Sequence, residues 1–272
     1  MKRLSLPLTT AVGLIGMPAL TACGSGSTDS ATSASAAMTP SASSTPSPSS
    51  TLSGTVTVLA AASLTESFTA LEKSFEAANP GVDVTISFGS SATLAQQIAQ
   101  GAPADLYASA GTKALDQLPA EAKAKPTTTL AKNVLEIATP PGNPKKVTGL
   151  ASLADASTNV VLCAETVPCG SAADAVLTKA AVTAHVVSRE VDVKATLAKI
   201  TLGEADAAIV YHSDVVAAGS KVEGVEIPAA QNTTLAYPLV RLTDTAATKA
   251  FADLLASAAG LKELEAVGFL AP

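Results

Sequence analysis

The stretch Thr55-Val-Thr-Val-Leu-Ala-Ala-Ala-Ser63 decides the fold, because it joins a strand to the start of a helix. Its first five residues are β-branched or aliphatic and predict a strand. Ser63 then opens Ser63-Leu-Thr-Glu66, which has the pattern of a helix capping box. The apolar residues that follow share one face of the predicted helix: Leu64, Phe68, Leu71 and Phe75. Asn79-Pro-Gly81 ends this helix.

The same alternation continues along the chain. Residues 82–88 have the pattern of a strand and residues 92–100 that of a helix, followed by a strand at 105–108 and a short helix at 112–118. This β-α-β-α-β order predicts an α/β fold with a mainly parallel sheet.

The rest of the sequence alternates less regularly. We expect further strands at residues 133–139, 159–163, 207–211 and 235–242, and helices at 170–181, 193–202, 245–258 and 261–267. Pro238 lies inside the last of these strands and has no backbone N–H. It therefore indicates an edge strand or a crossover position.

The first 53 residues have the composition of a targeting segment and a spacer. Two basic residues precede an apolar stretch at residues 4–20, as in a secretory signal. The next residues, Leu20-Thr-Ala-Cys23-Gly24, resemble the lipobox of bacterial lipoproteins. We expect a signal peptide at 1–22 and a lipidated Cys23 that starts a disordered Ser/Ala/Pro tether ending at residue 53. An ordinary signal peptide with an incidental cysteine is the alternative.

The overall composition excludes several classes of protein. The chain has 272 residues, of which 15% are charged, and its net charge of −6 argues against a nucleic-acid binder. Two His and three Cys are too few for a zinc cluster built from these residues. Aromatic residues make up only 3% of the chain, which argues against stacking of sugars, bases or flavins.

The cysteines divide into two groups. If Cys23 carries a lipid, Cys163 and Cys169 remain, and an exported protein is expected to join them in a disulfide. Two buried free thiols or a redox pair are the alternatives.

The sequence contains no recognisable catalytic motif. Gly-x-Ser-x-Gly, the Walker A motif and the dinucleotide-binding fingerprint are all absent. The spacing of His185 and His212 does not indicate a triad with any serine. We therefore predict no catalytic residue and no cofactor.

Binding of an anion fits the sequence better. Four predicted helices start with residues that leave backbone N–H groups exposed: Ser63, Ser91, Cys169-Gly170 and Asp192-Val193. Helices that follow parallel strands begin at one edge of the sheet, so these starts can meet in one cleft. Several of them together would hold a tetrahedral oxyanion without any Lys or Arg. The alternative is that the serines are plain helix caps.

Four segments carry a family resemblance: Ala60-Ala-Ala-Ser-Leu-Thr65, Phe88-Gly-Ser-Ser-Ala-Thr-Leu-Ala-Gln-Gln-Ile98, Gly101-Ala-Pro-Ala-Asp105 and Gly203-Glu-Ala-Asp-Ala-Ala-Ile-Val-Tyr211. In this order and spacing the chain resembles the periplasmic molybdate-binding proteins of ABC importers, the ModA family. The resemblance covers about residues 55–269.

The resemblance implies the two-lobed type II periplasmic solute-binding fold, with two crossovers between the lobes. The implied first lobe comprises residues 54–134 and 236–272, and the second comprises residues 135–235. The implied protein is an extracytoplasmic monomer, bound to the membrane only through its lipid anchor. It would deliver its ligand to a permease and an ATPase, without nucleic acid as a partner.

The resemblance also implies the ligand and its contacts. The ligand is molybdate or tungstate, held by neutral hydrogen-bond donors. Ser63 and Ser91 would each donate a hydroxyl and a backbone N–H. Cys169 and Val193 would each donate a backbone N–H, and Tyr211 would donate its phenol O–H.

Three neighbouring residues leave choices open. Ser90 adjoins Ser91 and is the alternative to it. Asp192 either caps its helix or points into the cleft, where its carboxylate would repel a dianion. His212 follows Tyr211, and alternation along a strand would turn it to the other side.

Two other functions remain open. A receptor for another oxyanion, such as sulfate or thiosulfate, would use similar donors. A protein of a different class, such as an exported hydrolase or an envelope adhesion module, would bind no such anion.

Overall fold

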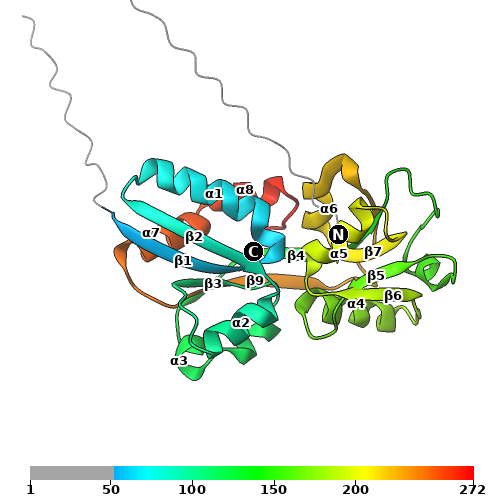
Figure 1. Ribbon diagram of the computed structural model, residues 1–272, viewed down its shortest axis with the longest axis horizontal. Coiled ribbons are helices and arrows are strands. Elements are labelled where there is room, and N and C mark those ends of the chain that lie inside the picture. Colours follow the sequence, from blue (N-terminus) through cyan, green and yellow to red (C-terminus); the bar gives the residue numbers. More distant parts are fainter. Residues whose placement is uncertain (1–51) are drawn as a thin grey trace, which may run out of the picture. The chain divides into compact units, whose positions relative to one another are not determined.

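The computed structural model describes residues 52–272, in which strands and helices alternate (Figure 1). Every strand expected from the sequence is present, and β6 and β8 are additional. The strands are β1 (Gly54–Ala61), β2 (Val82–Gly89), β3 (Leu106–Ala108), β4 (Thr127–Thr139), β5 (Val160–Cys163), β6 (Val186–Glu190), β7 (Ala207–Tyr211), β8 (Glu223–Glu226) and β9 (Thr234–Arg241).

The helices also follow the expected order, with one correction. The segment expected as a short helix at 112–118 is a 3₁₀ turn, Lys113–Gln117. The short helices α3 and α6 were not expected from the sequence. The helices are α1 (Thr65–Ala78), α2 (Ser91–Ala99), α3 (Ala120–Lys123), α4 (Pro168–Lys179), α5 (Val193–Thr201), α6 (His212–Ala218), α7 (Ala246–Leu255) and α8 (Ala258–Ala266).

The strands of the described residues join in the order β2-β1-β3-β9-β4-β7-β5-β6, and β8 also pairs with β4. β1 is parallel to β2 and β3, and β5 is parallel to β6 and β7. All pairings of β4 and β9 are antiparallel. The expectation of a mainly parallel sheet is therefore wrong: two parallel groups are joined by an antiparallel pair.

The strand β9 runs through the middle of the sheet order, between β3 and β4. Of the two positions that Pro238 indicated, the edge strand is therefore wrong, and the crossover position stays a prediction. Pro238 pairs with Thr129 where the register of β4 shifts between Thr129 and Ala131. An irregularity of this kind accommodates a residue that cannot donate to the ladder. The Pro238 carbonyl still accepts a hydrogen bond of 3.0 Å from the N–H of Ser109.

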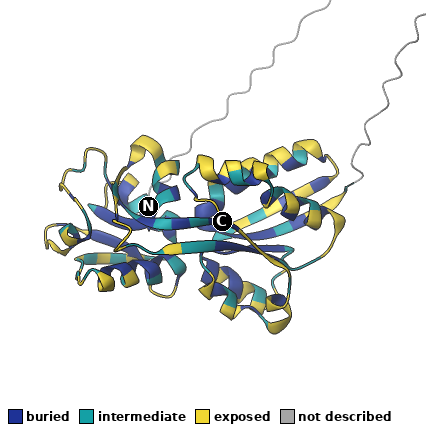
Figure 2. Ribbon diagram, turned by 180° about the vertical axis from the view of Figure 1, so that it is seen from behind, coloured by how far each residue is buried: buried dark blue, intermediate teal, exposed yellow. Residues whose placement is uncertain are grey.

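Helices cover both faces of the sheet. In Figure 1, α1 and α8 lie over β1, β2 and β9, and α2 and α3 lie on the opposite side. A small apolar cluster fills the space under α2, with Tyr107, Leu94 and Leu59 among its buried members. A larger cluster continues through the rest of the described chain, where the strands are mostly buried and the outer helix faces are exposed (Figure 2).

The N-terminal expectations fall mostly on residues that are not described. The signal peptide at 1–22, the lipidated Cys23 and the tether up to residue 51 lie outside the described residues. Leu52, at the end of the expected tether, packs against the larger apolar cluster. Within residues 52–272, none of the helices has the length and apolar character needed to cross a membrane.

Candidate functional site

One pocket brings together all five residues that the resemblance implied as ligands: Ser63, Ser91, Cys169, Val193 and Tyr211. Ser90 and Asp192 line the same pocket. Its cavity volume is about 20 Å³. Sites for drug-sized molecules measure roughly 300–1,000 Å³, so this pocket suits a smaller solute.

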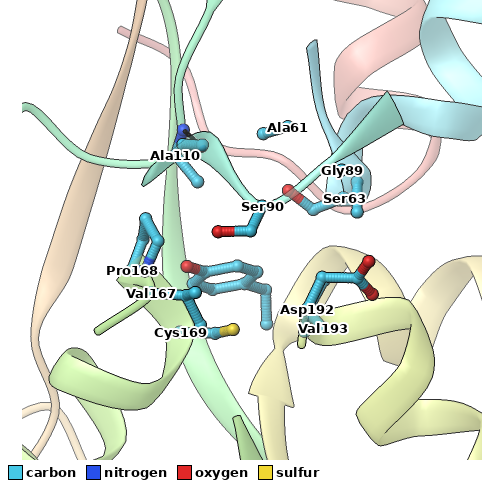
Figure 3. Close-up of a pocket in the computed structure, with 13 residues that line it drawn as sticks. Ala61, Ser63, Gly89, Ser90, Ala110, Val167, Pro168, Cys169, Asp192 and Val193 are labelled. Atoms are coloured by element: carbon cyan, nitrogen blue, oxygen red, sulfur yellow. Dashed lines mark hydrogen bonds between the residues drawn. The ribbon is translucent and has the colours of Figure 1, made fainter. Parts of the chain in front are cut away.

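Two walls face each other across the pocket (Figure 3). Ser63 follows β1 and Ser90 follows β2, so one wall is formed where these two parallel strands end. The opposite wall holds Cys169 in the first turn of α4 and Val193 at the first residue of α5. The pocket therefore lies where helices begin at the carboxyl ends of strands, as the sequence predicted.

A disulfide fixes the start of α4. Cys163, the last residue of β5, is bonded to Cys169, with their Cα atoms 5.7 Å apart. The expected disulfide is thus confirmed, and the alternative of free thiols is wrong. A side chain at Gly170 would collide with the carbonyl oxygen of Ala164, so glycine permits the close approach between this loop and the helix.

Two helix starts in the pocket carry no side-chain cap. Neither the side chain of Ser90 at the start of α2 nor that of Val167 at the start of α4 accepts a hydrogen bond from the first turn of its helix. The amide N–H groups of these first turns are directed out of the helix and have partial positive charge. They are suited to bind an anion in the pocket.

Ser63 does not cap a helix, so the capping box expected at Ser63-Leu-Thr-Glu66 is wrong. Ser63 lies inside a 3₁₀ turn, Ala62–Leu64, and α1 begins at Thr65. The Ser63 hydroxyl lies 2.9 Å from the Tyr237 hydroxyl. The Ser63 hydroxyl therefore contacts a residue 174 positions away instead of capping the helix that follows it.

The two adjacent serines have different partners. The Ser91 hydroxyl accepts a hydrogen bond of 2.9 Å from the N–H of Ala110. The Ser90 hydroxyl is buried and has no hydrogen-bond partner among the described residues. In Figure 3 the Ser90 side chain points into the pocket. The Ser91 hydroxyl keeps its own proton and can still donate it. The Ser90 hydroxyl, which was the alternative in the family pattern, can donate as well.

The hydroxyl of Tyr211 is the other unpaired donor. Tyr211 is 1% exposed, and its hydroxyl makes no hydrogen bond of good geometry within residues 52–272, although it interacts with the nearby Tyr237 side chain. Its ring stands edge-on to the ring of Tyr237, with the centroids 6.1 Å apart. Burial, together with the nearby Tyr237 and Asp214, raises the pKa of Tyr211 well above 10. The phenol therefore keeps its proton at neutral pH and can act as a donor.

The carboxylate of Asp192 is used locally. It accepts a hydrogen bond of 2.9 Å from the N–H of Ala195 and so caps α5. Of the two expected roles, the structure shows the cap. This bond engages one carboxylate oxygen in the helix instead of the pocket.

Both histidines lie away from the pocket. His212 is the first residue of α6 and not part of a strand, so strand alternation was the wrong reason to place it elsewhere. Its Nδ1 lies 2.6 Å from Oε2 of Glu136. Nδ1 of His185 lies 3.3 Å from the carbonyl oxygen of Thr158. Neither imidazole lines the pocket that contains Ser90.

The chemistry of the pocket is that of hydrogen-bond donation. Hydroxyl and amide donors surround it, and among the described residues no Lys, Arg or His lines it, although the carboxylate of Asp192 does. No group of three or more His, Cys, Asp or Glu residues suited to a metal cation occurs in the described part of the chain. Such a pocket suits a small anion that carries no proton of its own.

The sequence missed several residues around the pocket. Tyr237 contacts Ser63, and Lys194 contacts Glu66 and Asp214 directly behind the pocket. No local pattern identifies these residues, because their contacts join segments far apart in the chain.

The chain matches known proteins over nearly all of its described length. Residues 56–270 match a family model described as bacterial extracellular solute-binding protein. The molybdate-binding protein ModA of Mycobacterium tuberculosis is 37% identical over 222 residues, which cover 80% of this chain and 85% of that protein. ModA of Escherichia coli is 34% identical over 230 residues, covering 79% and 89%.

A solved structure shows the same fold. The periplasmic molybdate-binding protein of Azotobacter vinelandii superposes with a TM-score of 0.68 at 21% identity. The match covers 80% of this chain and 99% of that one.

Proposed function

Because the chain belongs to the family of bacterial extracellular solute-binding proteins, with their two-lobed type II fold, we propose that it is the molybdate receptor of an ABC importer. A relative that is 37% identical to it over 222 residues is named as a molybdate-binding protein. The proposed ligands are molybdate and the closely similar tungstate.

One observation carries this proposal: the pocket contains two buried hydroxyls, of Ser90 and Tyr211, that have no partner among residues 52–272. Burying an unpaired hydroxyl costs about 1–3 kcal/mol, and an acceptor in the pocket would remove that cost. The neighbouring helix starts, without side-chain caps, add amide donors. A tetrahedral oxyanion offers acceptors in several directions at once.

We assign the contacts residue by residue. Ser63 and Ser91 would each donate a hydroxyl and a backbone N–H, and Cys169 and Val193 would donate backbone N–H groups. Tyr211 would donate its phenol O–H. The Ser90 hydroxyl is an additional donor, because it is directed into the pocket and has no other partner.

The donor set also favours one kind of anion. Molybdate at neutral pH has no proton, so it only accepts hydrogen bonds. Hydrogen phosphate carries a proton and needs an acceptor, for which a carboxylate is suited. The one carboxylate among the described residues that line the pocket is that of Asp192, and one of its oxygens is bonded to its own helix. Sulfate and thiosulfate share the required chemistry and are the alternatives within this class.

An exported hydrolase is the alternative of another class, and the geometry argues against it. A serine nucleophile needs a base within hydrogen-bond reach. Neither histidine lines the pocket, and the Ser90 hydroxyl has no partner. The relatives are named as binding proteins. We infer that the protein binds its ligand without changing it.

The remaining assignments follow from this role. We propose an extracytoplasmic monomer with a signal peptide at 1–22 and a tether that begins at a lipidated Cys23. The first lobe would comprise residues 54–134 and 236–272, and the second residues 135–235. The partners would be the permease and the ATPase of the importer.

Isothermal titration calorimetry with molybdate, tungstate, sulfate and phosphate tests the proposal. We expect molybdate and tungstate to bind with micromolar or lower Kd and phosphate to give no heat. Tight binding of sulfate alone would favour the alternative oxyanion. No heat with any of the four would overturn the proposal.

A further inference from the structure

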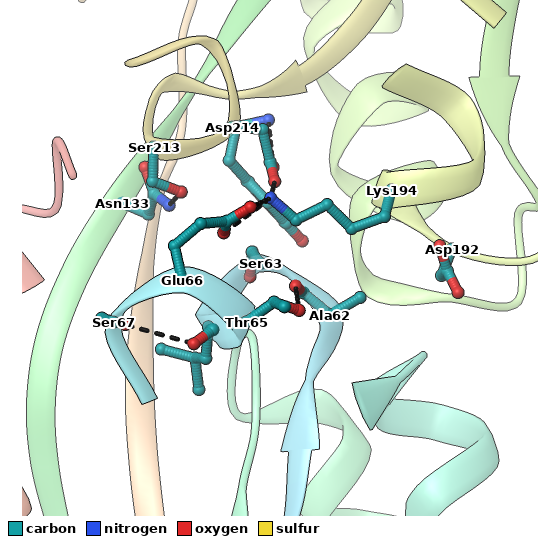
Figure 4. A network of polar contacts seen from close by, with 12 residues as sticks. Ala62, Ser63, Thr65, Glu66, Ser67, Asn133, Asp192, Lys194, Ser213 and Asp214 are labelled. Atoms are coloured by element: carbon teal, nitrogen blue, oxygen red, sulfur yellow. Dashed lines mark hydrogen bonds and ion pairs between the residues drawn. The ribbon is translucent and has the colours of Figure 1, made fainter. Parts of the chain in front are cut away.

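A single lysine joins two carboxylates behind the pocket (Figure 4). Nζ of Lys194 lies 2.8 Å from both carboxylate oxygens of Glu66 and 3.0 Å from Oδ1 of Asp214. Lys194 and Glu66 are 128 residues apart in the chain. The Asp214 side chain is fully buried, whereas that of Glu66 is 41% exposed.

Each of these residues belongs to a segment that supplies the pocket. Lys194 directly follows Val193 at the start of α5. Glu66 lies in the first turn of α1, close after the 3₁₀ turn that holds Ser63. Asp214 lies in α6, and its Oδ2 accepts a hydrogen bond of 3.4 Å from the N–H of Tyr211.

We propose that the ion pair of Lys194 and Glu66 is a latch that holds the two walls of the pocket together and slows release of the bound anion. In this inference, which rests on the proposed function, Lys194 and Glu66 are positioning residues. They do not line the pocket, and their charges are engaged with each other.

Asp214 holds Lys194 in place, so the contact between Lys194 and Glu66 is the part of the latch that opens. A buried carboxylate is costly unless a cation stays beside it, so Asp214 keeps the ammonium of Lys194 in place. Lys194 directly follows Val193, and Asp214 accepts a hydrogen bond from the N–H of Tyr211, so both are tied to segments that supply the pocket. Glu66 comes from the opposite wall and is more exposed, so it is the contact that separates when the walls part.

The strength of the latch follows from its exposure. An exposed ion pair contributes up to about 1 kcal/mol, which corresponds to roughly a fivefold change in a rate. The pair contributes only while both walls are together. Its loss therefore raises the dissociation rate constant, and the association rate constant stays nearly the same.

The test compares two matched variants that each change one carboxylate to an amide. Glu66→Gln removes the latch and leaves Asp214 paired with Lys194. Glu204→Gln is the control, because Glu204 pairs at 2.6 Å with Lys199, which lies in α5 as Lys194 does. Neither Glu204 nor Lys199 lines the pocket. Lys194→Arg keeps the charge and serves as the conservative variant.

Stopped-flow tyrosine fluorescence measures the rates, since the chain has no Trp and Tyr211 lines the pocket. The observed rate constant, plotted against molybdate concentration, gives the association rate constant from its slope and the dissociation rate constant from its intercept. We expect Glu66→Gln to release molybdate about fivefold faster. Glu204→Gln and Lys194→Arg should stay within about twofold of the wild type.

The outcomes separate this inference from the proposed function. If the wild type binds molybdate and Glu66→Gln releases it no faster than Glu204→Gln, the latch is overturned and the proposed function stands. If the wild type binds no molybdate in calorimetry, the proposed function fails and the inference with it. Higher salt should speed release from the wild type more than from Glu66→Gln, because salt screens the pair.

Discussion

Replacing Tyr211 by Phe should change stability and affinity in opposite directions. Without ligand, the Tyr211 hydroxyl is buried and has no hydrogen-bond partner in the described structure. An unsatisfied buried polar group costs about 1–3 kcal/mol, so its removal should stabilise the ligand-free protein by about 1 kcal/mol or more. Phe retains the ring and its edge-on contact with Tyr237.

The same substitution should weaken binding of molybdate. A hydrogen bond to a charged group contributes about 1.5–3 kcal/mol, which corresponds to a roughly 10- to 150-fold increase in Kd. Urea unfolding without ligand measures the first effect, and isothermal titration measures the second. The loss of affinity should also reduce the stabilisation of the protein by bound molybdate. At a concentration of 100 times the wild-type Kd, that stabilisation is about 2.7 kcal/mol for the wild type, and a 100-fold weaker variant would retain about 0.4 kcal/mol.

Tyr107→Phe is the control for this reasoning. The Tyr107 hydroxyl is also buried, but it donates a hydrogen bond of 2.7 Å to the carbonyl of Ser91. Its removal should therefore lower the stability of the ligand-free protein. The reasoning would be refuted if Tyr211→Phe were less stable than the wild type without ligand, or if it bound molybdate with unchanged Kd.

Three further predictions concern the buried carboxylate of Asp214, the two adjacent serines of the pocket and the disulfide. Burial, opposed by Lys194, raises the pKa of Asp214 from 3.8 to about 6. Between pH 5 and pH 7 the folded state therefore binds more protons than the unfolded state. Deprotonation of Asp214 should lower the free energy of unfolding by roughly 1 kcal/mol as the pH rises from 5 to 7. Urea unfolding at both pH values should show that Asp214→Asn lacks this loss; an unchanged slope would contradict it. Ser91→Ala should weaken molybdate binding by about 1–3 kcal/mol, and Ser90→Ala should weaken it without lowering ligand-free stability; wild-type Kd in calorimetry for either would remove that serine from the site. Cys163→Ser combined with Cys169→Ala should cost about 2 kcal/mol of stability and also weaken binding; unchanged melting and affinity would show that the disulfide does not hold the loop.

The order of strands and helices could be predicted because it depends on local patterns. Apolar spacing in α1 and the β-branched run of β1 act over a few residues, and both elements form where they were expected. β6 was missed because its alternation is short and both apolar side chains are only partly buried or exposed. The sequence could not show which strands pair antiparallel, because the pairing of β4 with β9 joins residues about a hundred positions apart.

The sequence brought together residues that lie near one another, but it could not predict their hydrogen bonds. The five residues that the resemblance named do line one pocket. The partner of Ser63 is a hydroxyl 174 residues away, and a helix-capping pattern contains no information about such a contact. The same holds for the ion pair of Lys194 and Glu66. Ser90 was only the alternative to Ser91, because the register of the resemblance favours Ser91. The sequence does not show that the Ser90 hydroxyl is buried without a partner among the described residues.

A crystal structure of the protein soaked with tungstate, with anomalous data collected at the tungsten edge, tests most directly whether the pocket binds the oxyanion. We expect one strong anomalous peak in the pocket, within hydrogen-bond reach of the Tyr211 hydroxyl and of the helix starts at Ser91, Cys169 and Val193. A peak confined to another part of the surface, or no peak in the pocket at saturating tungstate, would contradict it.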